Sequence, residues 1–215
     1  MRQQIIESLI SRIKKRLVTE RKSDEISLKI SRVIIKQFNK KEDFEIEGIT
    51  FERGDEYASF DLYCSFIKEE DYNEPFSISA EADAETLEIE ITYDPKAFPK
   101  NMKDLVAEVK ETVEHELEHI EQQNFEDMDV NDEFEYEDDD FFEYCISNKE
   151  VPAFVRGLIK RSKTKKITLN KAMDEWFKEN HRRFSNPDEE WPKVKKVWTD
   201  FANKMRSKEK VKKFK

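Results

Sequence analysis

The sequence predicts an α+β fold, in which helices pack against a four-stranded, mostly antiparallel sheet. Apolar residues recur every three or four positions up to about residue 40, every second position between 43 and 93, and every three or four positions again after residue 101. Four consecutive strands with no helix between them indicate mostly antiparallel pairing with one buried face.

The domain organisation follows the same changes of period. At 215 residues, a single domain of ordinary size is expected. Within it we expect an N-terminal helical pair (1–40), a central core (41–165) and C-terminal helices with a basic tail (166–215). These three parts are expected to form one compact unit.

The composition excludes some functions and leaves others open. Only three glycines are present, and neither a G-x-G-x-x-G nor a Walker pattern occurs, which argues against a glycine-rich phosphate loop. The net charge is −10, yet the segment 160–215 carries 19 basic and 8 acidic residues. This asymmetry fits a basic tail that contacts nucleic acid or an acidic partner, and it fits a solvated helical surface at least as well.

Two helices are predicted before the sheet. The first spans residues 3–20, and the second follows a cap at Ser23 or Asp24 and ends near Phe38. The basic cluster at residues 14–16 is assigned to helix surface rather than to nucleic-acid binding.

The predicted strands cover residues 44–51, 60–66, 76–82 and 87–93. The last two are separated by a short turn and should form a hairpin. Gly48 lies where the alternation of the first strand slips by one residue, which predicts a bulge or a tight bend.

Helical periodicity returns over residues 101–123, with one buried apolar stripe and glutamates on the opposite, solvated side. The run 126–143 holds eleven acidic residues and is expected to be an acidic surface loop. Further helices are predicted over 144–163, around Trp176, and after Pro187, and the last basic residues should fray.

The strongest chemical motif is H-E-x-x-H at residues 115–119. Two of the three histidines of the chain lie four residues apart there. On a helix both imidazoles face the same side, one turn apart, where they can hold one Zn²⁺. Glu116 would lie beside the metal, placed to take a proton from a zinc-bound water. The alternative is a chance match on a glutamate-rich helix.

A catalytic zinc site needs a third protein ligand and one position for water. His181 is the only other histidine, but Arg182 and Arg183 stand beside it and their charges would weaken metal binding. Glu150 is the stronger candidate. It can also complete a capping box with Ser147, and the residues alone weigh ligand and cap about evenly.

Two stretches together resemble the zinc metallopeptidases of the gluzincin type, including short intracellular and phage-encoded forms. The first reads H-E-L-E-H-I-E-Q at residues 115–122, and the second reads Y-C-I-S-N-K-E-V-P-A-F at residues 144–154. In that family H-E-L-x-H-x-x-Q precedes a motif similar to Y-x-S-x-x-E-x-x-A-[FY]. Here the tyrosine lies one residue further from the serine. The resemblance covers about fifty of the 215 residues.

The resemblance implies a zincin-like fold and a zinc metallopeptidase that cleaves protein or peptide substrates. It implies His115, His119 and Glu150 as ligands of one Zn²⁺, and Glu116 as the general base. Ala153 would let its helix pack close to the metal helix.

A peptidase also needs a second donor for the developing oxyanion. Tyr144, Tyr136 and His181 are the candidates, and the sequence does not distinguish them. An edge strand can hold an extended substrate by strand addition, and we expect the strand at 87–93 to do so.

Two other classes of function remain open. One is a non-enzymatic interaction protein, whose acidic and basic regions bind protein or nucleic acid and whose metal motif is vestigial. The other is a structural zinc site, although no fourth ligand is evident nearby. Cys64 and Cys145 do not make a disulfide framework, and no signal peptide or membrane span is visible, so an intracellular, cytoplasmic protein is expected.

Overall fold

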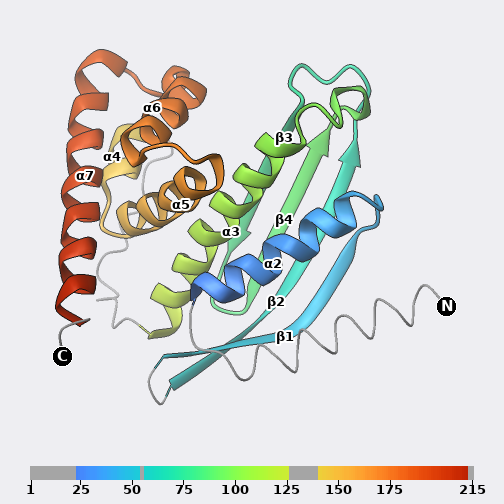
Figure 1. Ribbon diagram of the computed structural model, residues 1–215, viewed down its shortest axis with the longest axis horizontal. Helices are drawn as coiled ribbons and strands as arrows, with labels where there is room; N and C mark the ends of the chain where they lie inside the picture. The colour runs from blue at the N-terminus through green and yellow to red at the C-terminus, as the bar shows by residue number, and fades with distance from the viewer. Residues whose placement is uncertain (1–22, 54–55, 126–139, 213–215) are drawn as a thin grey trace. The chain divides into compact units, whose positions relative to one another are not determined.

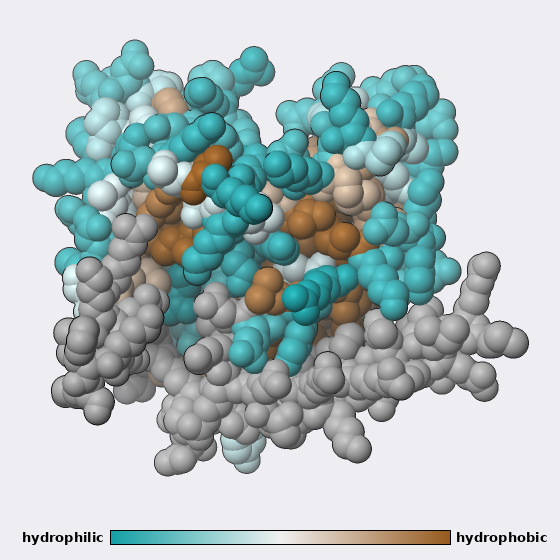
Figure 2. Space-filling model, in the orientation of Figure 1, coloured by the Kyte–Doolittle hydropathy of each residue, from teal (hydrophilic) through white to brown (hydrophobic). Residues whose placement is uncertain are grey.

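The computed structural model describes residues 23–53, 56–125 and 140–212 (Figure 1). The chain divides into two compact units, residues 1–127 and 128–215. The described residues form four strands and six α-helices, which confirms the α+β class. The helix predicted over 3–20 lies outside the described residues. Hydrophilic side chains cover most of the face shown in Figure 2, as the high content of charged residues leads one to expect.

The sheet consists of β1 (Phe44–Arg53), β2 (Glu56–Lys68), β3 (Phe76–Ala82) and β4 (Thr86–Tyr93) in the order β1-β2-β4-β3. β1 with β2 and β3 with β4 are antiparallel, and the second pair is the predicted hairpin. β2 and β4, however, are parallel, so the sheet is mixed. Alternation along a strand specifies its buried face but not its neighbour, which is why the sequence did not predict this pairing.

The position of β4 corrects one prediction about substrate binding. The strand at 87–93 was expected to be an exposed edge, but β4 pairs with β2 on one side and β3 on the other. The edges of this sheet are β1 and β3. Strand addition to β4 is therefore impossible, because its backbone hydrogen bonds are already made.

One face of the sheet is covered by α2 (Ser23–Phe38) and α3 (Met102–Phe125). The short 3-10 helix η1 (Pro95–Ala97) leads from β4 towards α3. The apolar residues of both helices and of the inner sheet face form one core, which includes the fully buried Ile34, Leu62, Leu87, Ile91 and Ile120. This layer of two helices on a sheet holds α3 in place.

Local backbone features of the sheet agree with the sequence. The register of β1 on β2 shifts between Ile46 and Ile49, and Gly48 has a φ of 62°, so the predicted bulge is confirmed. In the β3–β4 turn, Asp83 Oδ1 accepts hydrogen bonds from the N–H groups of Glu85 and Thr86, both at 2.7 Å. These bonds hold the pKa of the Asp83 carboxyl below its usual value, and the bond from Glu85 has the largest effect.

The stripe predicted for α3 is largely confirmed, whereas its solvated side is not. Leu105, Val109, Val113, Leu117 and Ile120 are buried, and Met102 and Val106 are half-buried. Glu114 and Glu118 were placed on or near the exposed side by helical phase, but both are buried. Helical phase gives the angle of a side chain about the axis and not what covers it.

The second unit is helical. It contains α4 (Phe141–Ile146), α5 (Glu150–Lys165), α6 (Leu169–Asn180), the 3-10 helix η2 (His181–Arg183) and α7 (Pro187–Lys212). Its core is mainly aromatic, with Phe154, Trp176, Trp191 and Trp198 in ring contact. The tryptophans of this unit thus serve packing.

Two predicted segment ends are wrong. The acidic loop 126–143 was expected to be irregular throughout, but Asp140 caps α4 by accepting from the N–H groups of Phe142 and Glu143, at 3.0 and 3.3 Å. Residues 126–139 lie outside the described part. At the other end, α7 continues to Lys212, through most of the basic residues that were expected to fray.

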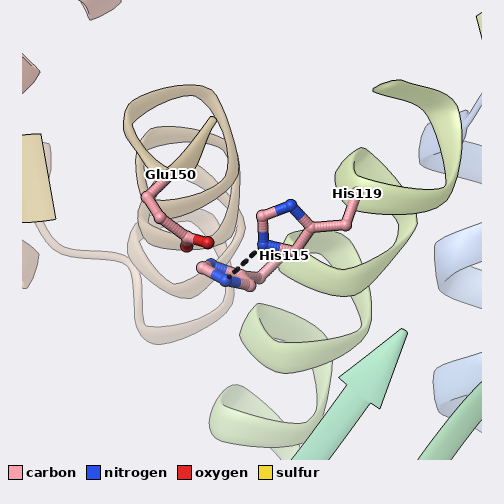
Figure 3. Close-up of side chains that lie close together, drawn as sticks. All are labelled: His115, His119 and Glu150. Carbon is pink, nitrogen blue, oxygen red and sulfur yellow. Dashed lines mark hydrogen bonds between the residues drawn. The ribbon is translucent and has the colours of Figure 1, made fainter. Parts of the chain in front are cut away.

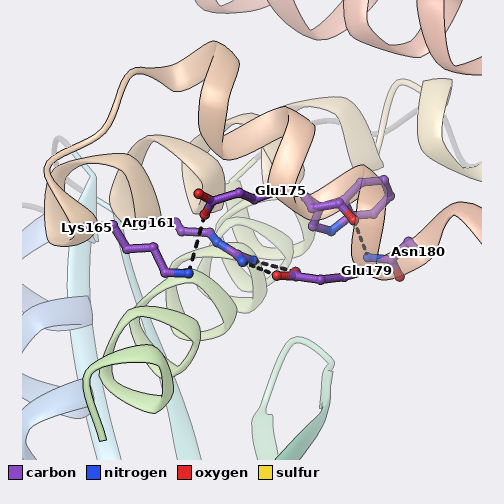
Figure 4. A network of polar contacts seen from close by, with 6 residues as sticks. Arg161, Lys165, Glu175, Glu179 and Asn180 are labelled. Carbon is purple, nitrogen blue, oxygen red and sulfur yellow. Dashed lines mark hydrogen bonds and ion pairs between the residues drawn. The ribbon is translucent and has the colours of Figure 1, made fainter. Parts of the chain in front are cut away.

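Ion pairs join α5 to α6 (Figure 4). Arg161 is 3% exposed and forms a two-pronged pair with Glu179, with one Nη1–Oε2 distance of 2.9 Å. Lys165 lies 3.4 Å from Glu175. The guanidinium–carboxylate fork fixes the crossing of the two helices more firmly than the longer lysine pair does.

No helix among residues 23–53, 56–125 and 140–212 has both the length and the apolar character that a membrane span requires.

Candidate metal centre

Helix α3 places the two motif histidines side by side. The Nε2 atoms of His115 and His119 are 3.1 Å apart, and their rings meet edge to face. Two nitrogens bound at 2.0–2.1 Å to one tetrahedral zinc ion would be about 3.3 Å apart. The observed spacing therefore fits two nitrogens that share an ion.

Gln122 fixes the orientation of one of these rings. Its Oε1 lies 3.3 Å from Nδ1 of His119, one turn further along α3, and its side chain is 2% exposed. An amide oxygen is an acceptor, so this contact favours the tautomer with the proton on Nδ1 and leaves the Nε2 lone pair for a metal. Gln122 is the last residue of the motif at 115–122, but no role was predicted for it from the sequence. The i+3 spacing from His119 was the available signal.

Glu116 follows His115 directly and is 9% exposed. A carboxylate is an uncommon choice for a largely buried position. Burial alone does not single out Glu116, because Glu114 and Glu118 on the same helix are buried as well. What distinguishes Glu116 is its position directly after His115 in the H-E-x-x-H motif.

Glu150 is the first residue of α5, and the hydrogen bonds of Ser147 show how this helix end is capped. The Ser147 hydroxyl accepts from the Glu150 N–H at 3.1 Å, which is the serine half of a capping box. The Ser147 N–H, to which the glutamate of a capping box would bond in return, donates to the carbonyl of Tyr144 at 3.3 Å. Ser147 thus caps the helix, and the cap does not require the Glu150 carboxylate.

The three predicted ligands form a cluster that can hold a metal ion. His115, His119 and Glu150 each offer one ligand atom, and these atoms all lie within 4.8 Å of one another (Figure 3). Ligands on a tetrahedral ion are about 3.3–3.5 Å apart, and rotation of a flexible glutamate side chain covers a difference of this size. Two imidazoles and one carboxylate also match the donor set of hydrolytic zinc sites, which keeps a fourth position open.

The positions of the predicted oxyanion donors do not indicate which of them, if any, has that role. The Tyr144 ring packs against Phe141 and Phe154 at the aromatic core of the second unit. His181 is exposed at the start of η2, with Nδ1 3.0 Å from the Lys178 carbonyl, and it does not belong to the ligand cluster. Tyr136 lies outside the described residues. The role of a donor stays a prediction for these side chains.

The two cysteines are free and buried, which argues against thiolate chemistry. Burial raises the pKa of Cys64 to about 12 and raises the pKa of Cys145 as well. Such a thiol stays protonated at neutral pH when no metal is bound and is a poor nucleophile, and neither cysteine belongs to the cluster of His115, His119 and Glu150.

Comparisons with protein-family models, with characterised proteins and with solved structures found no match to this chain. The side-chain chemistry of α3 and α5 is therefore the basis on which a function can be assigned.

Proposed function

We propose that the protein is a zinc-dependent peptidase, which hydrolyses peptide bonds in protein or peptide substrates. The observation that carries this proposal is the histidine pair of α3, with two Nε2 atoms 3.1 Å apart and Gln122 on the opposite nitrogen of His119. Glu150 adds the third donor within 4.8 Å. Without the pair, the remaining charges would not indicate any particular chemistry.

The residues that would hold the ion are His115, His119 and Glu150. Two neutral imidazoles and a carboxylate favour zinc over magnesium or calcium, which prefer oxygen ligands. When bound, zinc supplies Lewis-acid polarisation of a carbonyl group and a water whose pKa is near 7.

Glu116 is the proposed general base. It accepts a proton from the attacking water and delivers the same proton to the nitrogen of the leaving amine. Burial shields this carboxylate from bulk water, so the proton it holds is passed to the substrate rather than lost to solvent.

The substrate would be held by an edge strand. β3 is the edge that contacts α3, so we assign substrate binding by strand addition to β3 instead of β4. The free buried thiols agree with a reducing compartment, and we place the protein in the cytoplasm.

The test combines metal content with cleavage. The purified full-length chain should contain one zinc by elemental analysis and should cleave members of a peptide library, with products identified by mass spectrometry. Glu116→Gln should keep the metal and lose cleavage by about 100-fold or more. Asp104→Asn removes an exposed carboxylate from the first turn of the same helix and should change neither property.

Glu150→Ala separates a ligand from a cap. Loss of a ligand should lower zinc affinity severely, whereas loss of a cap costs about 1 kcal/mol of stability and leaves the metal bound. A folded sample that cannot take up zinc would refute the proposal, and so would undiminished cleavage by Glu116→Gln. A zinc-loaded chain with no cleavage activity would instead favour the interaction protein that the charge asymmetry allows.

A further inference from the structure

The sheet has a second face, turned away from α2 and α3, whose composition is unusual for a surface open to water. Four large hydrophobic side chains are exposed among the described residues, and three of them lie on β2: Tyr57, Tyr63 and Ile67, at 79%, 38% and 43%. They alternate with the buried Phe60 and Leu62, so all three are on the outer face. Three large hydrophobic side chains thus lie on the outer face of a central strand, with Ser59, Asp61 and Ser65 at the outward positions between them. These three side chains are called the apolar stripe of β2 below.

Carboxylates flank this stripe on both sides. Register places Glu45, Tyr63, Glu88 and Glu81 in one row across the four strands, and Glu90 lies in the next row. These side chains line a hollow of about 600 Å³. Where side chains of β1 to β4 are described, none of the outward-facing positions holds a lysine or arginine.

This arrangement is unfavourable for the sheet alone. Glu81 and Glu88 are directly opposite each other in the antiparallel β3–β4 pair, and like charges in such positions repel. Exposed aromatic and aliphatic side chains beside uncompensated carboxylates are complementary to a partner that is both apolar and basic.

A segment of the same chain has this composition. Residues 1–22, which lie outside the described residues, include seven basic and two acidic residues. Their apolar residues recur at helical spacing, at Ile6, Leu9, Ile10, Ile13 and Leu17. We propose that this N-terminal segment binds the outer face of the sheet, with its apolar stripe on Tyr63 and Ile67 and its basic side chains towards Glu45 and Glu88.

Length and connection agree with this placement. A helix over residues 3–17, which hold the apolar stripe, would be about 22 Å long, and the stretch of β2 from Tyr57 to Ile67 spans about 33 Å. The segment runs directly into α2, which contacts the edge strand β1 on the inner face. The apolar stripe of the segment ends at Leu17, and the five residues between Leu17 and α2 can span about 20 Å. This matches the separation of two layers that each pack about 10 Å from the same sheet. The chain can therefore pass one sheet edge to reach the outer face, and binding would convert two layers into three.

Hydrogen exchange on the full-length chain tests the proposal. The amides of residues 3–17 should be protected, and the double charge reversal Glu45→Lys with Glu88→Lys should speed their exchange by about ten-fold or more. The matched control, Glu69→Lys with Glu74→Lys, reverses two exposed carboxylates outside the hollow and should leave these amides protected. Unchanged exchange in α3 shows in the same data that each variant is folded.

Carbodiimide cross-linking of the unmodified chain then identifies the occupant. Links from Lys14, Lys15 or Lys22 to Glu45 or Glu88 within one chain support the proposal. Links only between ¹⁴N- and ¹⁵N-labelled chains would show that a second copy covers the face, and would overturn it. Unprotected amides and absent links would also overturn it, leaving the face to a basic partner protein.

Discussion

Replacement of Gln122 by leucine tests whether the metal centre is built as we describe. The change keeps the approximate volume of a buried side chain and removes the acceptor that lies 3.3 Å from Nδ1 of His119. Without that acceptor the His119 imidazole can carry its proton on Nε2, the nitrogen that faces His115. In that tautomer Nε2 has no lone pair with which to bind the metal.

The expected loss follows from the length of this contact. Removal of an outer partner of a ligating histidine lowers metal affinity by about 10- to 100-fold, which corresponds to about 1.4–2.7 kcal/mol. At 3.3 Å the bond is longer than the usual range of about 2.7–3.2 Å. We therefore expect a loss near the lower limit, about ten-fold.

The assay is competition for zinc with a chromophoric chelator of known affinity, after circular dichroism has shown that the metal-free variant is folded. Gln123→Leu provides the matched control, because it makes the same change at the exposed neighbouring position and should bind zinc as the parent does. Gln122→Glu keeps an acceptor and should bind at least as tightly. Parental zinc affinity in Gln122→Leu would refute the orienting role of this glutamine.

Three further predictions concern stability, measured by chemical or thermal unfolding. Gly48→Ala should cost about 1–2 kcal/mol, because φ is positive while nothing lies within 4 Å of an added Cβ, and Gly48→Asn should recover part of this loss. Asp83→Ala should destabilise slightly at pH 7. The pKa of Asp83 is lower in the folded than in the unfolded state, so its ionised carboxylate stabilises the fold above about pH 4. This stabilisation is lost as the pH falls through the folded-state pKa. The difference in unfolding free energy between the parent and Asp83→Ala should therefore narrow in acid. Glu179→Ala should lower the free energy of unfolding by about 1–3 kcal/mol, because it removes the two-pronged partner of the buried Arg161. Glu175→Ala removes the longer pair with Lys165 and should lower it by less than about 1 kcal/mol. Equal losses in the two glutamate variants would contradict this ranking.

The sequence predicted features of the fold that depend on residues close together in the chain, and it missed features that depend on residues far apart. Strand β3 has the predicted bounds, and the bulge at Gly48 lies where the alternation slips. Both features arise from neighbours in sequence, which periodicity reports directly. The parallel pairing of β2 with β4, by contrast, joins strands separated by β3, and no local pattern encodes it.

The same division applies to the candidate metal centre. Helical geometry alone converts the spacing of His115 and His119 into two adjacent imidazoles, so this half of the site was predictable from five residues. The role of Gln122 was missed because a side-chain orientation had to be seen before it could be interpreted. The cap at the start of α5 also needed coordinates, because its description depends on which acceptor the Ser147 N–H uses, and the ligand role of Glu150 stays a prediction.

The sequence by itself determined the elements, their buried faces and the chemical identity of the histidine pair, because each of these depends on residues within one or two turns or along one strand. Only the tertiary structure decided which strands are neighbours, which of the glutamates on α3 are buried, and that a carboxylate 31 residues after His119 has its ligand atom within 4.8 Å of the two imidazoles. Those features depend on contacts between residues far apart in the chain, and such contacts are selected by packing of the whole fold rather than by any local period.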